Sequence, residues 1–222
     1  LGIGAALTQR GMVHLRRGEL DAGEALWQEA LSLFQSLGSR WEQAAVLWRL
    51  GLAGYHRGAL AQAEAHLARG LALAQAIGHR ELCLLLHLTA GDVHATSARW
   101  RPAEAEYSDA LALGRATDDR RFLPRIFCGL AAVALARGDP AHAGQWVQEG
   151  RRLAAPEDVE AQGMLLREAG GVAQALGELE QALMLLRQSV AVLQSPPVPF
   201  ELARSRAALA RLEDGAGTKA PL

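Results

Sequence analysis

Three side chains that could bind a metal ion stand close together in the sequence: Cys83, His87 and His94. Thiolate and imidazole are ligands that zinc prefers. If the segment is helical, spacings of four and seven residues place the three side chains roughly on one face. A closed zinc site needs four ligands, and no fourth accompanies them. We therefore interpret the two histidines as packed, hydrogen-bonded side chains and expect neither a metal nor another cofactor.

The other candidate for chemistry is a glycine-rich segment near the C-terminus, where residues 215–219 read Gly-Ala-Gly-Thr-Lys. A phosphate-binding loop needs Gly-Lys-Ser/Thr between a strand and a helix. Here threonine precedes lysine, and the segment follows the last predicted helix. Serine-hydrolase and zinc-protease motifs and paired carboxylates at a catalytic spacing are also missing from the sequence. We therefore predict that the chain is not an enzyme.

Composition excludes several classes of partner. The 23 basic residues are balanced by 24 acidic ones, which argues against direct nucleic-acid binding. No apolar run approaches the roughly 20 residues of a membrane helix, so we expect no membrane contact. Two cysteines in 222 residues favour a reducing, cytoplasmic location. The chain begins with leucine rather than methionine, which suggests a piece of a longer protein.

Small residues recur at a period of 40. Gly11, Gly51 and Gly91 are followed at the same interval by Ala131, and then by Gly170. A second position lies seven residues further on in each period. Such periodicity is the signature of a repeat array rather than of one globular core. The residues at the second position are Gly18, Gly58, Ala98, Gly138 and Gly177.

Each period contains two helical segments, because alanine, leucine, arginine, glutamine and glutamate dominate on both sides of the second small residue. Asp139 and Pro140 indicate the N-cap and first residue of one of these helices. The fourth repeat should have its first helix over 121–137. The predicted domain covers 1–214, with repeats at about 1–38, 39–78, 79–118, 119–156 and 157–197, a capping helix at 199–213, and a flexible tail at 215–222.

The second helix of each repeat carries a finer pattern of small, bulky and small residues at spacings of four and three. These spacings place the three positions on one helix face. The small residues allow close backbone approach, and the bulky residue fills the remaining space. The bulky residues are Trp27, Leu67, Tyr107, Val147 and Leu186.

This pattern resembles the tetratricopeptide repeat, whose hallmarks appear here as Leu50-Gly51, Gly58, Ala63, Leu67 and Gly70. The resemblance covers about residues 4–213. The period of 40 exceeds the usual ~34, and in this respect the chain is similar to the longer repeats at the C-terminal end of bacterial signal-transducing ATPases and transcriptional regulators. The resemblance implies an all-α, right-handed α-solenoid of five helix-turn-helix repeats with a C-terminal capping helix.

The resemblance also implies that the first helices line a concave groove. Aromatic and aliphatic side chains beside arginines would suit a peptide or an acidic group. The alternative is that these residues are ordinary packing and solvated charge. The predicted groove residues are Met12, Arg16, Trp48, Tyr55, His56, Asp92, Arg125, Cys128, Arg167 and Gln174.

The function that follows is a non-catalytic scaffold that binds a protein or peptide, as the sensor or interaction part of a larger cytoplasmic regulator. Two alternatives stay open. The groove could bind a small ligand such as a metabolite, which a closed pocket with polar groups would favour. The array could also be a self-association module, although few apolar residues fall on the outer helix faces.

Overall fold

The computed structural model describes residues 2–117, 120–195 and 197–217, and this part of the chain is helical without a strand. Most residues lie in helices because strong helix formers fill both halves of each repeat. Within the described residues the elements are α1 (Gly2–Arg16), α2 (Leu20–Ser36), α3 (Arg40–Arg57), α4 (Leu60–Ala76), α5 (Arg80–Thr96), α6 (Trp100–Ala116), α7 (Leu123–Ala136), α8 (Pro140–Leu153), α9 (Val159–Ala175), α10 (Leu179–Gln194) and α11 (Pro199–Gly217).

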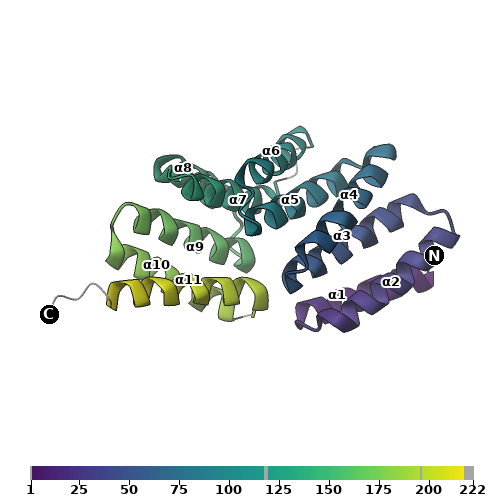
Figure 1. Ribbon diagram of the computed structural model, residues 1–222, viewed down its shortest axis with the longest axis horizontal. Coiled ribbons are helices and arrows are strands. Elements are labelled where there is room, and N and C mark those ends of the chain that lie inside the picture. The colour runs from purple at the N-terminus through teal and green to yellow at the C-terminus, as the bar shows by residue number, and fades with distance from the viewer. Residues whose placement is uncertain (1, 118–119, 196, 218–222) are drawn as a thin grey trace. The chain divides into compact units, whose positions relative to one another are not determined.

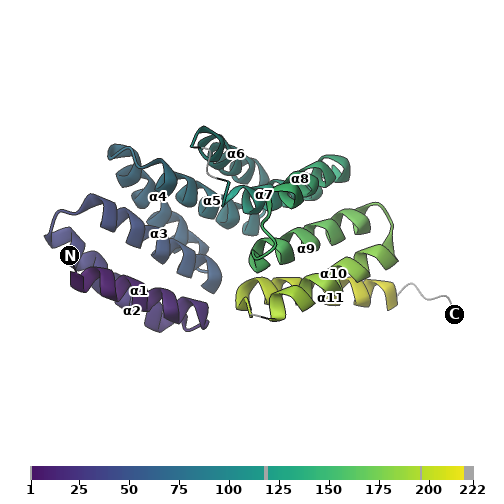
Figure 2. The same cartoon turned by 180° about the vertical axis from the view of Figure 1, so that it is seen from behind.

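Consecutive helices pack in pairs, and each pair is one repeat: α1 with α2, α3 with α4, and so on to α9 with α10 (Figure 1). The unpaired α11 packs on α10 and α9, and the three helices lie side by side in both views (Figure 2). The fold is therefore an all-α solenoid of helical repeats, as predicted. The chain divides into two compact units, 1–119 and 120–222.

The turn inside each repeat has one design. Gly58 has a φ of 83°, in the left-handed region that glycine adopts without strain. The next amide, that of Ala59, donates back to the carbonyl of Gly54 at 2.8 Å, which closes α3 with a Schellman motif. Ala98 occupies the same position with a φ of 55°, and Arg99 N donates to the carbonyl of His94 in the same way. The turn geometry is therefore kept even where glycine is replaced.

Helix ends follow the predicted signals with two differences. Asp139 caps α8 as expected, since its carboxylate accepts from the amide of His142 at 3.0 Å. The predicted helix 121–137 instead begins at Leu123, because Pro124 lacks an amide hydrogen and fits the first helical turn. At the C-terminus, α11 continues through Gly217 and so enters the predicted tail 215–222, whose last residues, 218–222, lie outside the described residues.

The 40-residue period has a packing cause inside each repeat. The recurring glycine of the first helix lies against the bulky residue 16 positions later on the second helix. A Cβ on Gly51 would approach the Leu67 side chain to 2.6 Å, and one on Gly91 would approach the Tyr107 ring to 2.5 Å. Gly11 faces Trp27 and Gly170 faces Leu186 in the same way. In the fourth repeat alanine replaces glycine at Ala131, and the bulky residue is the smaller Val147.

A second set of contacts joins neighbouring repeats. Gly70 of α4 receives Leu86 of α5, whose nearest methyl would lie 2.9 Å from an added Cβ. Gly150 of α8 receives Leu165 of α9, at 2.5 Å. The first repeat carries Ala30 at the corresponding place, and this residue is fully buried. The fit between repeats therefore differs from one interface to the next.

A double-mutant cycle tests the fit inside one repeat. In the fourth repeat Ala131 lies opposite Val147, which predicts that alanine is tolerated when the bulky residue is valine. Gly51→Ala and Leu67→Val should each lower the free energy of unfolding by about 1 kcal/mol, through overpacking and through a cavity. The double variant should lose no more than either single one, a coupling of about 1 kcal/mol. Urea unfolding followed by circular dichroism measures all three.

The control is Gly2→Ala, because an added Cβ there meets no atom within 4 Å. It should leave stability unchanged or slightly higher. Additive losses in the double variant would show that the glycine and the leucine do not share one packing space.

Candidate functional site

Each compact unit contains a hollow to which its first helices contribute. In the first unit the hollow has a volume of about 330 Å³. Equivalent positions of α1 and α3, 40 residues apart, line its two sides. Ala5 and Ala45 are one such pair, and their short side chains leave the space open. We call it the α1–α3 pocket, and its lining consists of Gly2, Ala5, Thr8, Gln9, Phe34, Trp41, Glu42, Ala45, Val46 and Arg49.

Arg49 is the cation of the α1–α3 pocket. One of its terminal nitrogens donates to the carbonyl of Ala45 at 2.8 Å, and its guanidinium carbon lies 5.3 Å from the centre of the Trp48 ring. Its Nε is buried and has no hydrogen-bond partner among the described residues. Burial lowers the pKa of Arg49. The pocket thus combines apolar side chains with one guanidinium, that of Arg49, and one carboxylate, that of Glu42.

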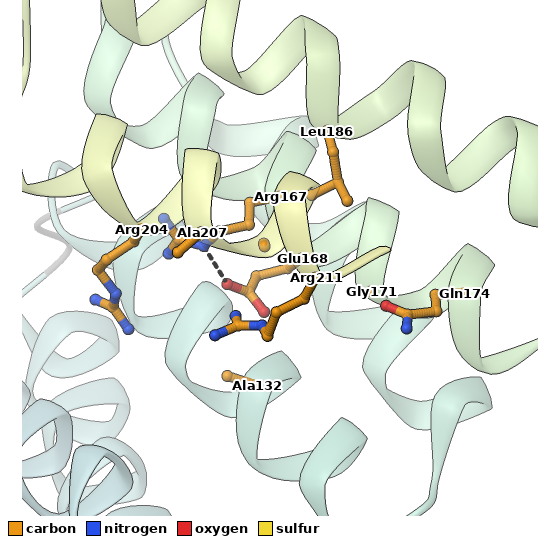
Figure 3. A pocket seen from close by; sticks show the side chains of 10 residues that line it. Ala132, Arg167, Glu168, Gly171, Gln174, Leu186, Arg204, Ala207 and Arg211 are labelled. Carbon is orange, nitrogen blue, oxygen red and sulfur yellow. Dashed lines mark hydrogen bonds and ion pairs between the residues drawn. The ribbon is translucent and has the colours of Figure 1, made fainter. Parts of the chain in front are cut away.

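The second hollow lies between α7, α9, α10 and α11 and has a volume of about 390 Å³ (Figure 3). Its floor is formed by small residues, and arginines from α11 stand at its edge. We call it the α9–α11 pocket. The lining consists of Ala132, Arg167, Glu168, Gly171, Gln174, Leu186, Arg204, Ala207, Ala208 and Arg211.

A buried ion-pair network supports this pocket. Arg167 is only 8% exposed and bonds to Glu201 Oε2 at 2.6 Å and to Glu168 Oε1 at 3.2 Å. Arg204 contacts the other oxygen of Glu201 at 3.3 Å. Burial by itself raises the pKa of Glu201, but Arg167, Arg204 and Arg125 outweigh it and lower the pKa to about 2. Burial alone would lower the pKa of Arg167. The carboxylates of Glu201 and Glu168 outweigh this effect, so the pKa of Arg167 is raised overall.

The structure brings together only two of the ten predicted groove residues, Arg167 and Gln174, which both line the α9–α11 pocket. Four of the ten are buried in packing rather than exposed on a groove. Tyr55, Cys128 and Arg167 are less than a tenth exposed, and Asp92 accepts a hydrogen bond from the Tyr107 hydroxyl at 2.8 Å. Burial raises the pKa of Cys128 well above its usual value.

The remaining predicted residues lie outside both pockets. Trp48 is half-buried, and its Nε1 donates to Thr89 Oγ1 at 2.9 Å, which ties α3 to α5. Arg125 is half-buried as well. Met12 and His56 are partly exposed, whereas Arg16 is exposed. Whether these side chains bind a partner stays a prediction.

Sequence reasoning missed the cations that do line the pockets: Arg49, Arg204 and Arg211. The repeat frame contained the signal. Arg49 lies 40 residues after Gln9, and Arg211 lies 40 residues after Gly171. Treating the last helix as the first half of a sixth repeat would have placed Arg204 and Arg211 on the same inward face.

The possible metal ligands Cys83, His87 and His94 occupy one helix, α5, but take separate roles. His87 Nδ1 lies 2.7 Å from Glu106 Oε2 on α6. His94 is buried, and its Nδ1 has no hydrogen-bond partner among the described residues, contrary to the expected bond. Within the described part of the chain, no group of three histidine, cysteine, aspartate or glutamate side chains is arranged to hold a metal ion.

Comparison with known proteins identifies the fold. No protein-family model matches the chain, and no curated protein sequence matches it either. Solved structures do. The apo form of RapI superposes with a TM-score of 0.67 at 12% identity, over 87% of this chain and 71% of that one. A Rap protein complexed with Competence and Sporulation Factor gives 0.65 at 11% identity, over 96% of this chain and 75% of that one.

Kinesin light chain repeats described as nearly identical and TPR-like, from Podosopora anserina, give a TM-score of 0.62 at 17% identity, over 86% of this chain and 95% of theirs. The fold is thus that of a tetratricopeptide repeat array, as the sequence pattern indicated. None of the described helices is both long enough and apolar enough to cross a membrane.

Proposed function

We propose that this chain is a non-catalytic scaffold whose inward helix faces bind a peptide segment of a partner protein. The observation that carries the proposal is the α1–α3 pocket, where apolar side chains such as Phe34, Trp41 and Val46 lie beside the half-buried guanidinium of Arg49. An apolar side chain would fill the space, and a carbonyl or carboxylate oxygen would accept from the arginine. One of the similar solved structures, the Rap protein, is complexed with Competence and Sporulation Factor, which is consistent with a binding role for this fold.

We further propose that the array is the sensor or interaction part of a larger cytoplasmic regulator. The support for this context is the long-repeat resemblance described above. A small metabolite is the second candidate ligand. Its support is the size of the α1–α3 pocket, since about 330 Å³ lies at the lower end of the volumes that small molecules occupy.

Blocking the pocket tests the proposal. Ala5 lines the α1–α3 pocket and is exposed, so Ala5→Trp should fill the space without disturbing the core. We expect peptides selected by the whole chain from a random phage-displayed library to bind Ala5→Trp at least ~10-fold more weakly, the equivalent of losing one anchoring contact. Fluorescence anisotropy with labelled peptides measures the dissociation constants.

The matched control is Ala6→Trp, which adds the same side chain at an exposed neighbour that does not line the pocket. It should bind within ~2-fold of the unmodified chain, and both variants should melt at the same temperature. Equal peptide binding by Ala5→Trp and the unmodified chain would remove the pocket from the proposal. If the chain bound small metabolites but no peptide from the library, the second candidate ligand, a metabolite, would be favoured.

A further inference from the structure

The α9–α11 pocket differs from the α1–α3 pocket in its charge. Three arginines line it against one glutamate, Glu168, which is already paired with Arg167. Glu201, buried behind the pocket, is shared between Arg167 and Arg204. Arg167 and Arg204 therefore each have a carboxylate partner already.

Arg211 is the pocket arginine for which no ion pair is found among the described residues. It is exposed and lines the pocket. Figure 3 shows Arg204 and Arg211 extending from α11 on the same side of the helix, toward Ala132, with Glu168 between them. The two arginines are seven residues apart, which is two helical turns, so they share one face with Cα atoms about 10 Å apart.

The surface between the two arginines is lined by short side chains. Ala207 and Ala208 of α11 face Ala132 and Gly171, and together they leave the hollow of about 390 Å³. Apart from Glu168, whose carboxylate is held by Arg167, short side chains therefore border the path along α11 between the arginines. If the two arginine side chains extend in parallel, their guanidinium groups keep about the spacing of their Cα atoms, which suits an anion longer than a single carboxylate.

We propose that the α9–α11 pocket binds an acidic peptide segment that presents two carboxylates about 10 Å apart, one to Arg204 and one to Arg211. In a helical ligand this separation corresponds to acidic residues at i and i+7, and in an extended ligand to i and i+3. The identification of the ligand as a peptide rests on the proposed function. The negative charge of the ligand and the separation of its two carboxylates are inferred from this pocket alone.

Synthetic peptides on an alanine–glutamine background test the pocket directly. One series carries two glutamates at i and i+7 or at i and i+3, and the other carries glutamines at the same places. Titration of the whole chain by NMR measures millimolar and tighter dissociation constants. We expect at least one diglutamate peptide to bind at least ~10-fold more tightly than its diglutamine counterpart, with a preference that weakens as salt is raised.

Arg211→Glu should abolish this preference, and a dilysine peptide should then bind the variant more tightly than the unmodified chain. The matched control is Arg206→Glu, which makes the same charge change at an exposed position of α11 outside the pocket. It should retain the preference within ~2-fold. Equal loss in both variants, or equal binding of the two peptide series, would overturn the proposal.

Two further results separate this proposal from the proposed function. Citrate binding as tightly as the best peptide would identify a small polyanion and would overturn the peptide assignment. Diglutamate peptides that bind Ala5→Trp normally and fail with Arg211→Glu would support the acidic site. They would do so even if library selection gave no ligand for the α1–α3 pocket, which would contradict the proposed function alone.

Discussion

Trp27→Ala should lower the free energy of unfolding by about 3–5 kcal/mol. The indole is fully buried, its ring packs against Gly11, and its Nε1 donates to the carbonyl of Thr8 at 3.1 Å. The substitution leaves a cavity that the rigid backbone around Gly11 cannot close, and it leaves the Thr8 carbonyl without this donor. Urea unfolding monitored by circular dichroism measures the loss.

Trp41→Ala is the matched control, because the Trp41 side chain is 49% exposed. It should cost less than ~1 kcal/mol, since half of its surface already contacts water. Hydrogen exchange should show that the effect of Trp27→Ala is concentrated in residues 1–119, because stability in a repeat array is roughly a sum of local terms. A loss below ~1 kcal/mol for Trp27→Ala would contradict the assigned packing.

Glu201→Ala should cost about 3 kcal/mol, at the lower end of the range for breaking a buried ion pair. The substitution leaves the buried Arg167 guanidinium with Glu168 at 3.2 Å as its remaining partner. Glu213→Ala removes an exposed ion pair with Arg187, 3.0 Å long, and should cost less than ~1 kcal/mol. The double variant Arg167→Met/Glu201→Leu should recover part of the loss, because the buried pair is removed together, while Glu168, whose side chain is 12% exposed, then loses Arg167.

The contribution of Glu201 should depend on pH in a defined direction. Its pKa is lowered from 4.5 to about 2, so the folded chain releases this proton more readily than the unfolded chain. The stabilisation is therefore complete above the unfolded value and is lost as pH falls from about 4.5 toward 2. Unfolding at pH 7, 4 and 2.5 should show the gap between the unmodified chain and Glu201→Ala narrowing. A constant gap would contradict the lowered pKa.

The fold could be predicted because its determinants recur locally. The glycine at Gly51 and the bulky Leu67 repeat at fixed spacing, and the turn glycine at Gly58 is favoured by its positive φ. The start of α7 was predicted two residues too early because helix propensity outweighed the proline signal at Pro124. Such local conflicts shift boundaries without changing the order of elements.

The site was harder to predict because periodicity identifies a helix face but not what covers it. Arg167 lies on the predicted face, yet α11 supplies Glu201 and buries the pair. Asp92 follows Gly91, which receives the Tyr107 ring, so its carboxylate meets the phenol instead of solvent. Which carboxylate pairs with which arginine depends on contacts between elements that sequence spacing does not determine.

The contacts between repeats also mean that the order of the repeats is encoded in the chain. The contact between a glycine and a bulky side chain within one repeat, such as Gly51 with Leu67, is kept if its 40-residue segment is duplicated or moved. The contact across a boundary is not, because Gly70 accommodates Leu86 from the following repeat whereas the first repeat offers Ala30. Deleting residues 39–78 would bring Leu86 against the methyl group of Ala30. A shortened or reshuffled array therefore needs a compensating change at each new junction, and natural gain or loss of repeats in such a chain is constrained at its boundaries.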